Sequence, residues 1–238
     1  MSIFKSDSQL VEHFSNAIDK TKALNSNLNN STLLAAGILN YHGMSGVMTR
    51  ILMNNLANFD GLKYAEIGTF TGSTLFSALY GNKIAALCCD NWSQFNGPSE
   101  QFKINMNVYS QGTPVNQSVE VFEADFNDLE FGIGSWKDID FYLFDGPHDK
   151  KSQYNGIVKA YPALSDRFIV MVDDWNWGGP REGTLDAIRD LEITVLNDLR
   201  ITTDPEQFNE IGQVTNRFQN SNWHNGIAVF ACKKKEIA

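Results

Sequence analysis

The sequence predicts an α/β fold, a Rossmann-like three-layer sandwich whose mostly parallel sheet is covered by helices on both faces. Short apolar runs typical of strands alternate with helical patterns from about residue 60 onward. A loop with glycines at positions 68 and 72 follows the first of these strands, and an acidic residue follows each of the next four. Because ligands of such sheets bind beyond the carboxyl ends of the strands, the residues after each strand are the candidate site.

Length and charge limit the classes of function. A chain of 238 residues, 42% of them hydrophobic, can bury a sizeable core within one α/β domain. The net charge is −9, and the only run of basic residues is Lys233 to Lys235. Surfaces that bind nucleic acid need clusters of Lys and Arg, so general nucleic-acid binding is not expected.

The cysteines and the N-terminus indicate the compartment. Cys88, Cys89 and Cys232 form neither a disulfide framework nor the CxxC spacing of a metal site. Cys88 and Cys89 lie in an apolar run, so we expect these two to be core residues. The first residues lack the apolar stretch of a signal peptide, and no apolar run is long enough to span a membrane. We therefore expect a soluble, cytoplasmic protein with no membrane partner.

Residues 1–59 are expected to form an N-terminal helical cap or lid on a domain that comprises residues 60–238. A second apolar helix should begin near Thr32, a loop with two glycines follows at 41–46, and Ser45 is placed to cap a third helix. The first helix is indicated by four apolar residues at helical spacing, namely Leu10, Val11, Phe14 and Ile18.

Strands and helices alternate in the rest of the chain. The segment 193–202 is ambiguous but favours a strand. With it, the predicted strands cover residues 62–67, 83–89, 118–123, 140–144, 167–172, 193–202 and 226–233. The predicted helices between them cover residues 71–80, 99–109, 150–164 and 182–191.

The stretch from Glu66 to Ser73 reads EIGTFTGS and joins the first of these strands to a helix. A glycine directly after a strand lets the backbone approach a ligand with no Cβ in the way. The spacing differs from the G-x-G-x-x-G of dinucleotide-binding folds and from the phosphate-binding P-loop. The acid at Glu66 favours a cationic or amino-bearing ligand over a pyrophosphate. The alternative is an ordinary tight turn between strand and helix.

Acids after the second and third strands suggest a nucleoside site. Asp90 lies 22 residues after Gly68, at the tip of the neighbouring strand, where carboxylates bind ribose hydroxyls. Asp125 and Phe126 are placed to bond an exocyclic amine and to stack on a base. Trp92 either lies against a purine or packs in the core. A helix cap at Asp90 and a turn aspartate at Asp125 are the alternatives.

Acids after the fourth and fifth strands suggest a metal site. Asp145, Asp173 and Asp174 should meet at one sheet edge, where like charges raise one another's pKa unless a cation intervenes. Mg²⁺, Mn²⁺ and Ca²⁺ take such oxygen ligands. His148 is the nearest histidine, with a pKa suited to proton transfer. Alternatively, Asp174 caps a loop, Asp173 bonds to backbone and His148 is an ordinary loop residue.

Five segments, YAEIGTFTGS, CCDNW, FEADF, DFYLFDGPH and FIVMVDDW, together resemble the class I S-adenosylmethionine (SAM)-dependent methyltransferases. Within that superfamily they resemble the macrocin-type sugar O-methyltransferases, over about residues 45–232. The resemblance implies a seven-stranded sheet whose last strand is antiparallel. One departure is Pro147, which stands where the fourth-strand motif of that group, D-G-D, has its second acid.

The resemblance also implies roles for the strand-tip residues. Glu66 and the loop after it would hold the amino-acid end of SAM, Asp90 the ribose, and Asp125 with Phe126 the adenine. The predicted cofactor-binding residues are Glu66, Gly68, Thr69, Gly72, Ser73, Asp90, Asn91, Trp92, Asp125, Phe126 and Asp145. The predicted Mg²⁺ ligands are Asp145, Asp173 and Asp174.

The predicted function is transfer of a methyl group from SAM to a hydroxyl oxygen of a small acceptor, such as a sugar, with help from Mg²⁺ or another divalent cation. Asp145 or His148 would take the proton. Two alternatives stay open: a nucleotide-dependent oxidoreductase on the same fold, and a non-catalytic SAM-binding module. The N-terminal helices could also mediate a homodimer.

Overall fold

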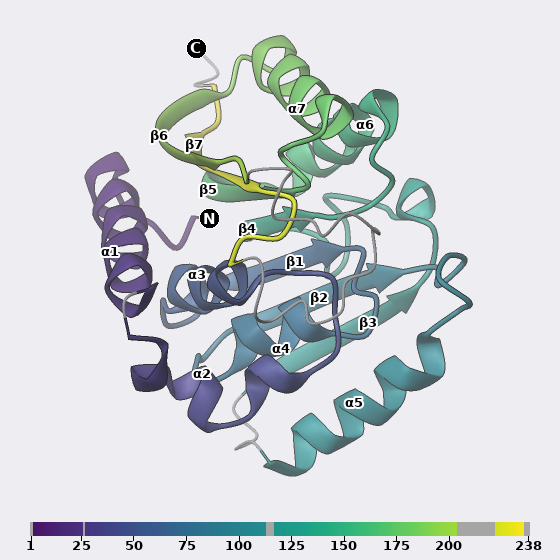
Figure 1. The fold of residues 1–238 in the computed structure, drawn as a ribbon. Helices are drawn as coiled ribbons and strands as arrows, with labels where there is room; N and C mark the ends of the chain where they lie inside the picture. The colour runs from purple at the N-terminus through teal and green to yellow at the C-terminus, as the bar shows by residue number, and fades with distance from the viewer. Residues whose placement is uncertain (1, 26, 113–116, 204–221, 236–238) are drawn as a thin grey trace.

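The computed structural model describes residues 2–25, 27–112, 117–203 and 222–235 (Figure 1). Its centre is a seven-stranded sheet with the order β3-β2-β1-β4-β5-β7-β6. Neighbouring strands are parallel except at β7, which runs antiparallel to both β5 and β6. The mostly parallel sheet with an antiparallel last strand is therefore confirmed.

The elements have the following bounds. The strands are β1 Lys63–Ile67, β2 Ala85–Asp90, β3 Ser118–Glu123, β4 Ile139–Phe144, β5 Leu164–Asp173, β6 Thr194–Ile201 and β7 Ile227–Lys233. The α-helices are α1 Asp7–Asn25, α2 Thr32–Ala35, α3 Val47–Ala57, α4 Ser73–Leu79, α5 Ser99–Gly112, α6 Lys150–Ala160 and α7 Gly178–Asp190. Short 3₁₀ turns are η1 Leu28–Asn30, η2 Ile38–Asn40, η3 Phe126–Asp128 and η4 Tyr161–Ala163.

Successive side chains along each strand point to opposite faces of the sheet, so the protein has two hydrophobic cores, one on each face. In β1, Tyr64 packs with α1, α3, α4 and α5, whereas Ala65 and Ile67 face the opposite core. Helix α6 contributes Ala160 to that second core, and Ile188 of α7 packs against it. Both faces of the central strands are buried, as expected for parallel strands flanked by helices.

The N-terminal segment differs from expectation at two points. The predicted second helix is only the four-residue α2, because Gly37 follows it in the left-handed region, at φ 73°. Ser45 was expected to cap the third helix. Instead Gly46 is at the N-cap of α3, and the Met48 N–H donates to the Asn222 carbonyl at 2.8 Å. The Ser45 hydroxyl is engaged by Arg50 instead.

Boundaries elsewhere shift for local reasons. The helix predicted over 150–164 ends at Ala160, because Pro162 cannot donate to a continuing helix and lies in a 3₁₀ turn instead. Strand β5 consequently begins at Leu164, three residues before its predicted start. The ambiguous segment at 193–202 is strand β6, as favoured.

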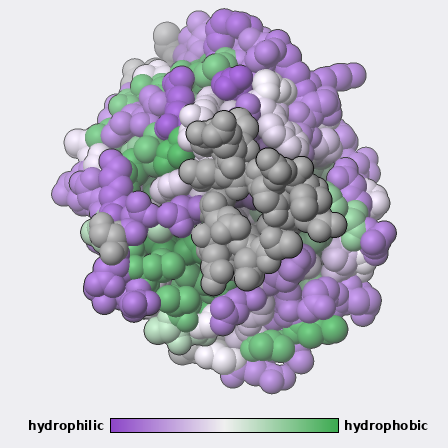
Figure 2. Space-filling model, viewed as in Figure 1, coloured by the Kyte–Doolittle hydropathy of each residue, from purple (hydrophilic) through white to green (hydrophobic). Residues whose placement is uncertain are grey.

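The surface in Figure 2 is mostly polar, with smaller apolar areas. All three cysteines are buried and free, which confirms the prediction that Cys88 and Cys89 are core residues. In the described parts of the chain, no helix has both the length and the apolar character needed to cross a bilayer.

Candidate functional site

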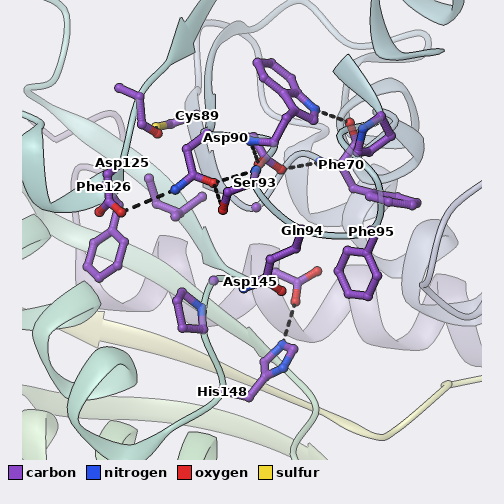
Figure 3. Close-up of a pocket in the computed structure, with 18 of the residues that line it drawn as sticks. Phe70, Cys89, Asp90, Ser93, Gln94, Phe95, Asp125, Phe126, Asp145 and His148 are labelled. Carbon is purple, nitrogen blue, oxygen red and sulfur yellow. Dashed lines mark hydrogen bonds and ion pairs between the residues drawn. The ribbon is translucent and has the colours of Figure 1, made fainter. Parts of the chain in front are cut away.

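A pocket that is partly open to solvent lies beyond the carboxyl ends of β1, β2, β3 and β4 (Figure 3). The strand order reverses here, since β1 leads to β2 on one side and β4 on the other. Crevices at such reversals are the usual ligand sites of open parallel sheets. The pocket is lined by Met44, Ile67, Gly68, Phe70, Cys89, Asp90, Asn91, Trp92, Ser93, Gln94, Phe95, Pro98, Ala124, Asp125, Phe126, Asp145, Gly146, Pro147 and His148.

The glycines of the first loop are required by the protein's own backbone. Gly68 has φ 90°, and a Cβ there would lie 1.8 Å from the Asp145 carbonyl oxygen. Gly72 has φ 91° and would place a Cβ 2.6 Å from the Phe76 ring. Of the predicted ligand-binding residues in this loop, Gly68 lines the pocket, whereas Thr69, Gly72 and Ser73 are not among the lining residues.

Glu66 lies in β1, just before this loop, and its side chain is on the same face of the sheet as that of Tyr64. Its side chain is fully buried and is not among those lining the pocket. Burial raises the pKa of this carboxyl to about 7, although hydrogen bonds, first among them the 2.6 Å bond donated by the Tyr64 hydroxyl, oppose the rise. The predicted contact between Glu66 and a ligand therefore stays a prediction, and the described contacts of Glu66 are internal.

Asp90, at the end of β2, joins two loops of the pocket. Its Oδ2 accepts the Phe70 N–H and its Oδ1 accepts the Trp92 N–H, both at 2.7 Å. The Trp92 indole N–H in turn donates to the Phe70 carbonyl at 2.7 Å. Both loop residues have positive φ, 51° and 46°, a conformation that bulky residues adopt only when it is held by other contacts.

The tip of the third strand completes one wall of the pocket. Asp125 Oδ1 caps the turn η3 by accepting the Asn127 N–H at 2.8 Å. The Asn91 amide donates to Asp125 Oδ2 at 3.3 Å and so links the tips of β2 and β3. Phe126 lines the pocket with its ring edge-on to Phe144, at 5.2 Å between centroids. The structure thus brings Asp90, Asn91, Asp125 and Phe126 to one wall.

Trp92 lines the same pocket, but most of its side chain packs against other residues of the protein. The side chain is buried, and its ring lies 5.2 Å from that of Phe102 in α5. Of the two predicted roles of Trp92, packing in the core is therefore observed.

An acid–histidine cluster lies at the other end of the pocket. His148 Nε2 is 2.9 Å from Asp174 Oδ2 and 3.5 Å from Asp145 Oδ1. One potential ligand atom from each residue lies within 4.8 Å of the others. The Asn225 amide, from the turn before β7, donates to Asp174 Oδ1 in a short hydrogen bond. Asn225 had no sequence signal, because it is brought to Asp174 only by the antiparallel return of β7.

The pKa values of the two acids of the cluster are shifted in opposite directions. Burial raises the pKa of Asp145. Burial also acts to raise that of Asp174, but hydrogen bonding and charge from His148, with the Asn225 bond, lower it. Burial alone would lower the pKa of His148, yet its hydrogen bonds and charge interactions with both acids raise it to about 10. In this arrangement the imidazole holds a proton at neutral pH.

Asp173 is separate from the cluster that the other two predicted metal ligands form with His148. Its side chain is buried, and its Oδ1 has no hydrogen-bond partner among the described residues. Burial, followed by the charges of Asp145 and Asp174, raises its pKa well above the usual value. Two of the three predicted ligands are therefore grouped with His148, and the third lies nearby as a buried acid.

The two tryptophans after β5 have different surroundings. Trp175 is buried, with its ring edge-on to Phe230. Trp177 is 46% exposed, and its ring is perpendicular to the His148 imidazole at 5.0 Å between centroids. Of the loop that follows β6, residues 204–221 lie outside the described part of the chain. Trp223 and His224 are described, and His224 lies near enough to Asp174 to help lower its pKa.

Residues 65–175 match a family model described as a methyltransferase domain. No curated protein matches the chain in sequence. Among solved structures, a proposed O-methyltransferase from Klebsiella pneumoniae aligns with a TM-score of 0.52 and 12% identity, over 89% of this chain and 94% of that one. A proposed RNA methyltransferase from Pyrococcus horikoshii aligns with a TM-score of 0.50 and 14% identity, over 79% and 82%.

A proposed SAM-dependent methyltransferase from Streptococcus mutans also aligns, with a TM-score of 0.50 and 15% identity. The alignment covers 77% of this chain but only 47% of that one, so this chain spans about half of its length. At such identities the solved structures establish the fold. The family model for a methyltransferase domain is matched over just under half of the chain.

Proposed function

We propose that this protein binds SAM in the pocket beyond β1–β4 and transfers its methyl group to a hydroxyl oxygen of a small acceptor. The observation that carries the proposal is the row of strand-tip residues along one wall, Asp90 and Asn91 from β2 and Asp125 with Phe126 from β3. Carboxylates at such tips suit ribose hydroxyls and an exocyclic amine, and the Phe126 ring suits the face of a base.

The cluster at the other end of the pocket supports assistance by a divalent cation. Asp145 and Asp174 offer carboxylate oxygens, which Mg²⁺ and Mn²⁺ prefer, and His148 offers a nitrogen. The nearby Asp173 Oδ1 is buried and without a hydrogen-bond partner among the described residues, as an oxygen that serves a cation would be. Bound there, a divalent cation supplies positive charge that lowers the pKa of a nearby hydroxyl.

The chain's own residues would then position the acceptor and take up its proton. In the transfer, the acceptor oxygen bonds to the methyl carbon as the carbon–sulfur bond breaks, leaving S-adenosylhomocysteine (SAH) and a proton. We propose that Asp145, which lines the pocket and lies 3.5 Å from His148, accepts that proton. His148 can accept it only after losing its own, which a cation sharing the charge of Asp145 and Asp174 would promote.

The lining favours a neutral or cationic acceptor over nucleic acid. No Lys or Arg is among the described lining residues, whereas Asp90, Asp125 and Asp145 are. A phosphate backbone would meet unfavourable charge there. A sugar or another small hydroxylated molecule fits these side chains better, because it would contact the exposed Trp177 ring and the acids beside it.

Two measurements test this function. Titration calorimetry with SAM, SAH and NAD should show SAM and SAH binding and no comparable NAD binding. Methyl-labelled SAM with a panel of sugars, catechols and small hydroxy acids, with and without Mg²⁺, should label a hydroxylated acceptor. Tight NAD binding without SAM binding would favour the oxidoreductase alternative. SAM binding with no transfer to any acceptor would favour a non-catalytic module.

Asp174→Asn tests the metal assignment. Asn suits the left-handed backbone of this residue, at φ 54°, better than Ala does, so the fold should be kept. We expect methyl transfer to lose its stimulation by Mg²⁺, while the Kd for SAH stays within about twofold of wild type, because Asp174 is not among the pocket-lining residues. Full metal stimulation in this variant would contradict the assignment.

A further inference from the structure

Arg50, in the first turns of α3, is a fully buried arginine whose described hydrogen bonds go to the preceding segment. Its Nε donates to the Ser45 hydroxyl at 2.8 Å. Its Nη1 donates to the Tyr41 carbonyl at 2.8 Å and to the Leu39 carbonyl at 3.3 Å. One guanidinium therefore fixes three points of residues 39–45, which we call the 39–45 segment.

The 39–45 segment also contacts the glycine loop after β1 and the first residue of α4. The Thr71 hydroxyl donates to the His42 carbonyl in a short hydrogen bond. Gly43 packs so closely on Ser73 that a Cβ at Gly43 would lie 1.8 Å from the Ser73 hydroxyl oxygen. The His42 ring lies 5.6 Å from the ring of Phe70, measured between centroids.

Two residues connect these contacts to the pocket. Met44, within the 39–45 segment, lines the pocket directly, and so does Phe70 of the glycine loop. Phe70 is also the residue whose N–H is bound by Asp90 (Figure 3). Met44 and Phe70 thus line the pocket beside the 39–45 segment, to which Arg50 is hydrogen-bonded. Arg50 itself is not a lining residue.

Burying a guanidinium is unfavourable unless its donors are matched, and a single ammonium group cannot reproduce its fork of donors. Desolvation lowers the pKa of Arg50 to about 10, which still leaves it charged at neutral pH. The hydrogen bonds to two carbonyls and one hydroxyl satisfy the Nε and Nη1 donors. A buried residue held in this way restricts the position of every group it binds.

We propose that Arg50 is a positioning residue for the cofactor pocket: by fixing the 39–45 segment, it holds Met44 and Phe70 where they shape the wall of the pocket. The inference rests on the proposed SAM site and adds to it a residue outside the pocket. A purely structural role is the rival explanation, and it predicts lower stability with unchanged cofactor binding in the folded variant.

Asn54 provides a matched control, one turn further along α3. Its side-chain amide donates to the Ser77 carbonyl at 2.8 Å and to the Tyr80 carbonyl at 2.7 Å, both near the end of α4. Asn54→Ala therefore removes hydrogen bonds between α3 and the rest of the fold without touching the 39–45 segment. It should lower thermal stability and leave the pocket unchanged.

The experiment titrates SAH into wild type, Arg50→Lys, Ser45→Ala and Asn54→Ala, each with its thermal unfolding midpoint. We expect Arg50→Lys to raise the Kd for SAH about 10- to 100-fold and Ser45→Ala to raise it less, because Ser45→Ala removes only one acceptor of the guanidinium. Asn54→Ala should keep the Kd within about twofold of wild type. Ser45→Ala keeps the test informative if Arg50→Lys does not fold.

A double-mutant cycle with Met44→Ala tests the route of the effect. If Arg50 acts through the 39–45 segment, Met44→Ala should weaken SAH binding in wild type and have little further effect in Arg50→Lys. Additive effects, or wild-type affinity in both Arg50→Lys and Ser45→Ala, would overturn the proposal. If the Arg50 proposal fails but wild type binds SAH tightly, the proposed SAM site is still supported. If wild type does not bind SAH, both the SAM site and the role of Arg50 are contradicted.

Discussion

Asp90 shows how one strand-tip residue can serve both the protein and its ligand. Its position after β2 was enough to predict a carboxylate in the pocket, and the pocket does include it. The sequence could not show that both oxygens also accept backbone N–H groups, from Phe70 and Trp92. Each carboxylate oxygen can accept a second hydrogen bond, so ribose hydroxyls could still be bound.

We predict that Asp90→Asn weakens SAH binding nearly as much as Asp90→Ala, by about 10-fold or more. Asn has only one acceptor oxygen, so its amide would face one of the two backbone N–H groups. Calorimetric titration with SAH measures the effect, and Asp128→Asn, at an exposed position that does not line the pocket, serves as the control. If Asp90→Asn bound SAH like wild type, the two loops would not depend on the carboxylate.

Glu66 leads to a prediction about stability and pH. Its pKa is about 7 in the folded protein, against 4.5 for an ordinary glutamate, so the folded protein binds the proton more tightly than the unfolded chain does. The wild-type free energy of unfolding should therefore lose a contribution as pH rises through this window. Glu66→Gln lacks that loss, so its stability relative to wild type should rise by up to about 3 kcal/mol between acidic and mildly basic pH.

Denaturant unfolding of the ligand-free protein at several pH values from about 5 to 8 measures this difference. Glu130→Gln is the control, since Glu130 is exposed. A difference between Glu66→Gln and wild type that does not change with pH would mean that Glu66 is ionised normally in the folded protein.

At the scale of elements, periodicity predicted the strands well, because buried parallel strands are short apolar runs bounded by polar turns. The helices before β1 were predicted less well. Gly37 shortens α2, and the start of α3 is bound by the Asn222 carbonyl instead of by Ser45. Such contacts join residues far apart in the chain and leave no local pattern, which is also why Asn225 was not found.

The junction of α7 with the loop before α6 gives a prediction at this scale. A Cβ at Gly179 would lie 2.2 Å from the His148 carbonyl oxygen, whereas one at Gly178 would meet only the flexible end of Glu182, at 3.6 Å. Gly179→Ala should displace His148, lower the thermal midpoint and weaken Mn²⁺ binding about tenfold. Gly178→Ala should keep wild-type Mn²⁺ affinity and gain up to about 1 kcal/mol of stability.

Calorimetric titration with Mn²⁺ and thermal unfolding of both variants check this prediction. Equal Mn²⁺ affinities in the two variants would show that the position of His148 does not depend on the close approach of α7.

At the scale of the whole molecule, the sheet order explains why acids that are far apart in sequence meet at one edge. Parallel strands bring their carboxyl ends together, so the tips of β1 to β4 surround one pocket and the tip of β5 brings Asp174 to His148. The sequence predicted this convergence from the alternation of strands and helices, which implies a mostly parallel sheet. It did not predict that His148, instead of Asp173, would complete the group with Asp145 and Asp174, because that depends on side-chain direction.

The central claim is that these strand tips hold SAM with its methyl group directed toward the acid–histidine cluster. A crystal structure of the protein with SAH tests it most directly. We predict ribose hydroxyls at Asp90, the adenine beside Phe126 and the sulfur near Asp145. SAH bound elsewhere, or bound in this pocket with its sulfur directed away from Asp145 and His148, would contradict the account.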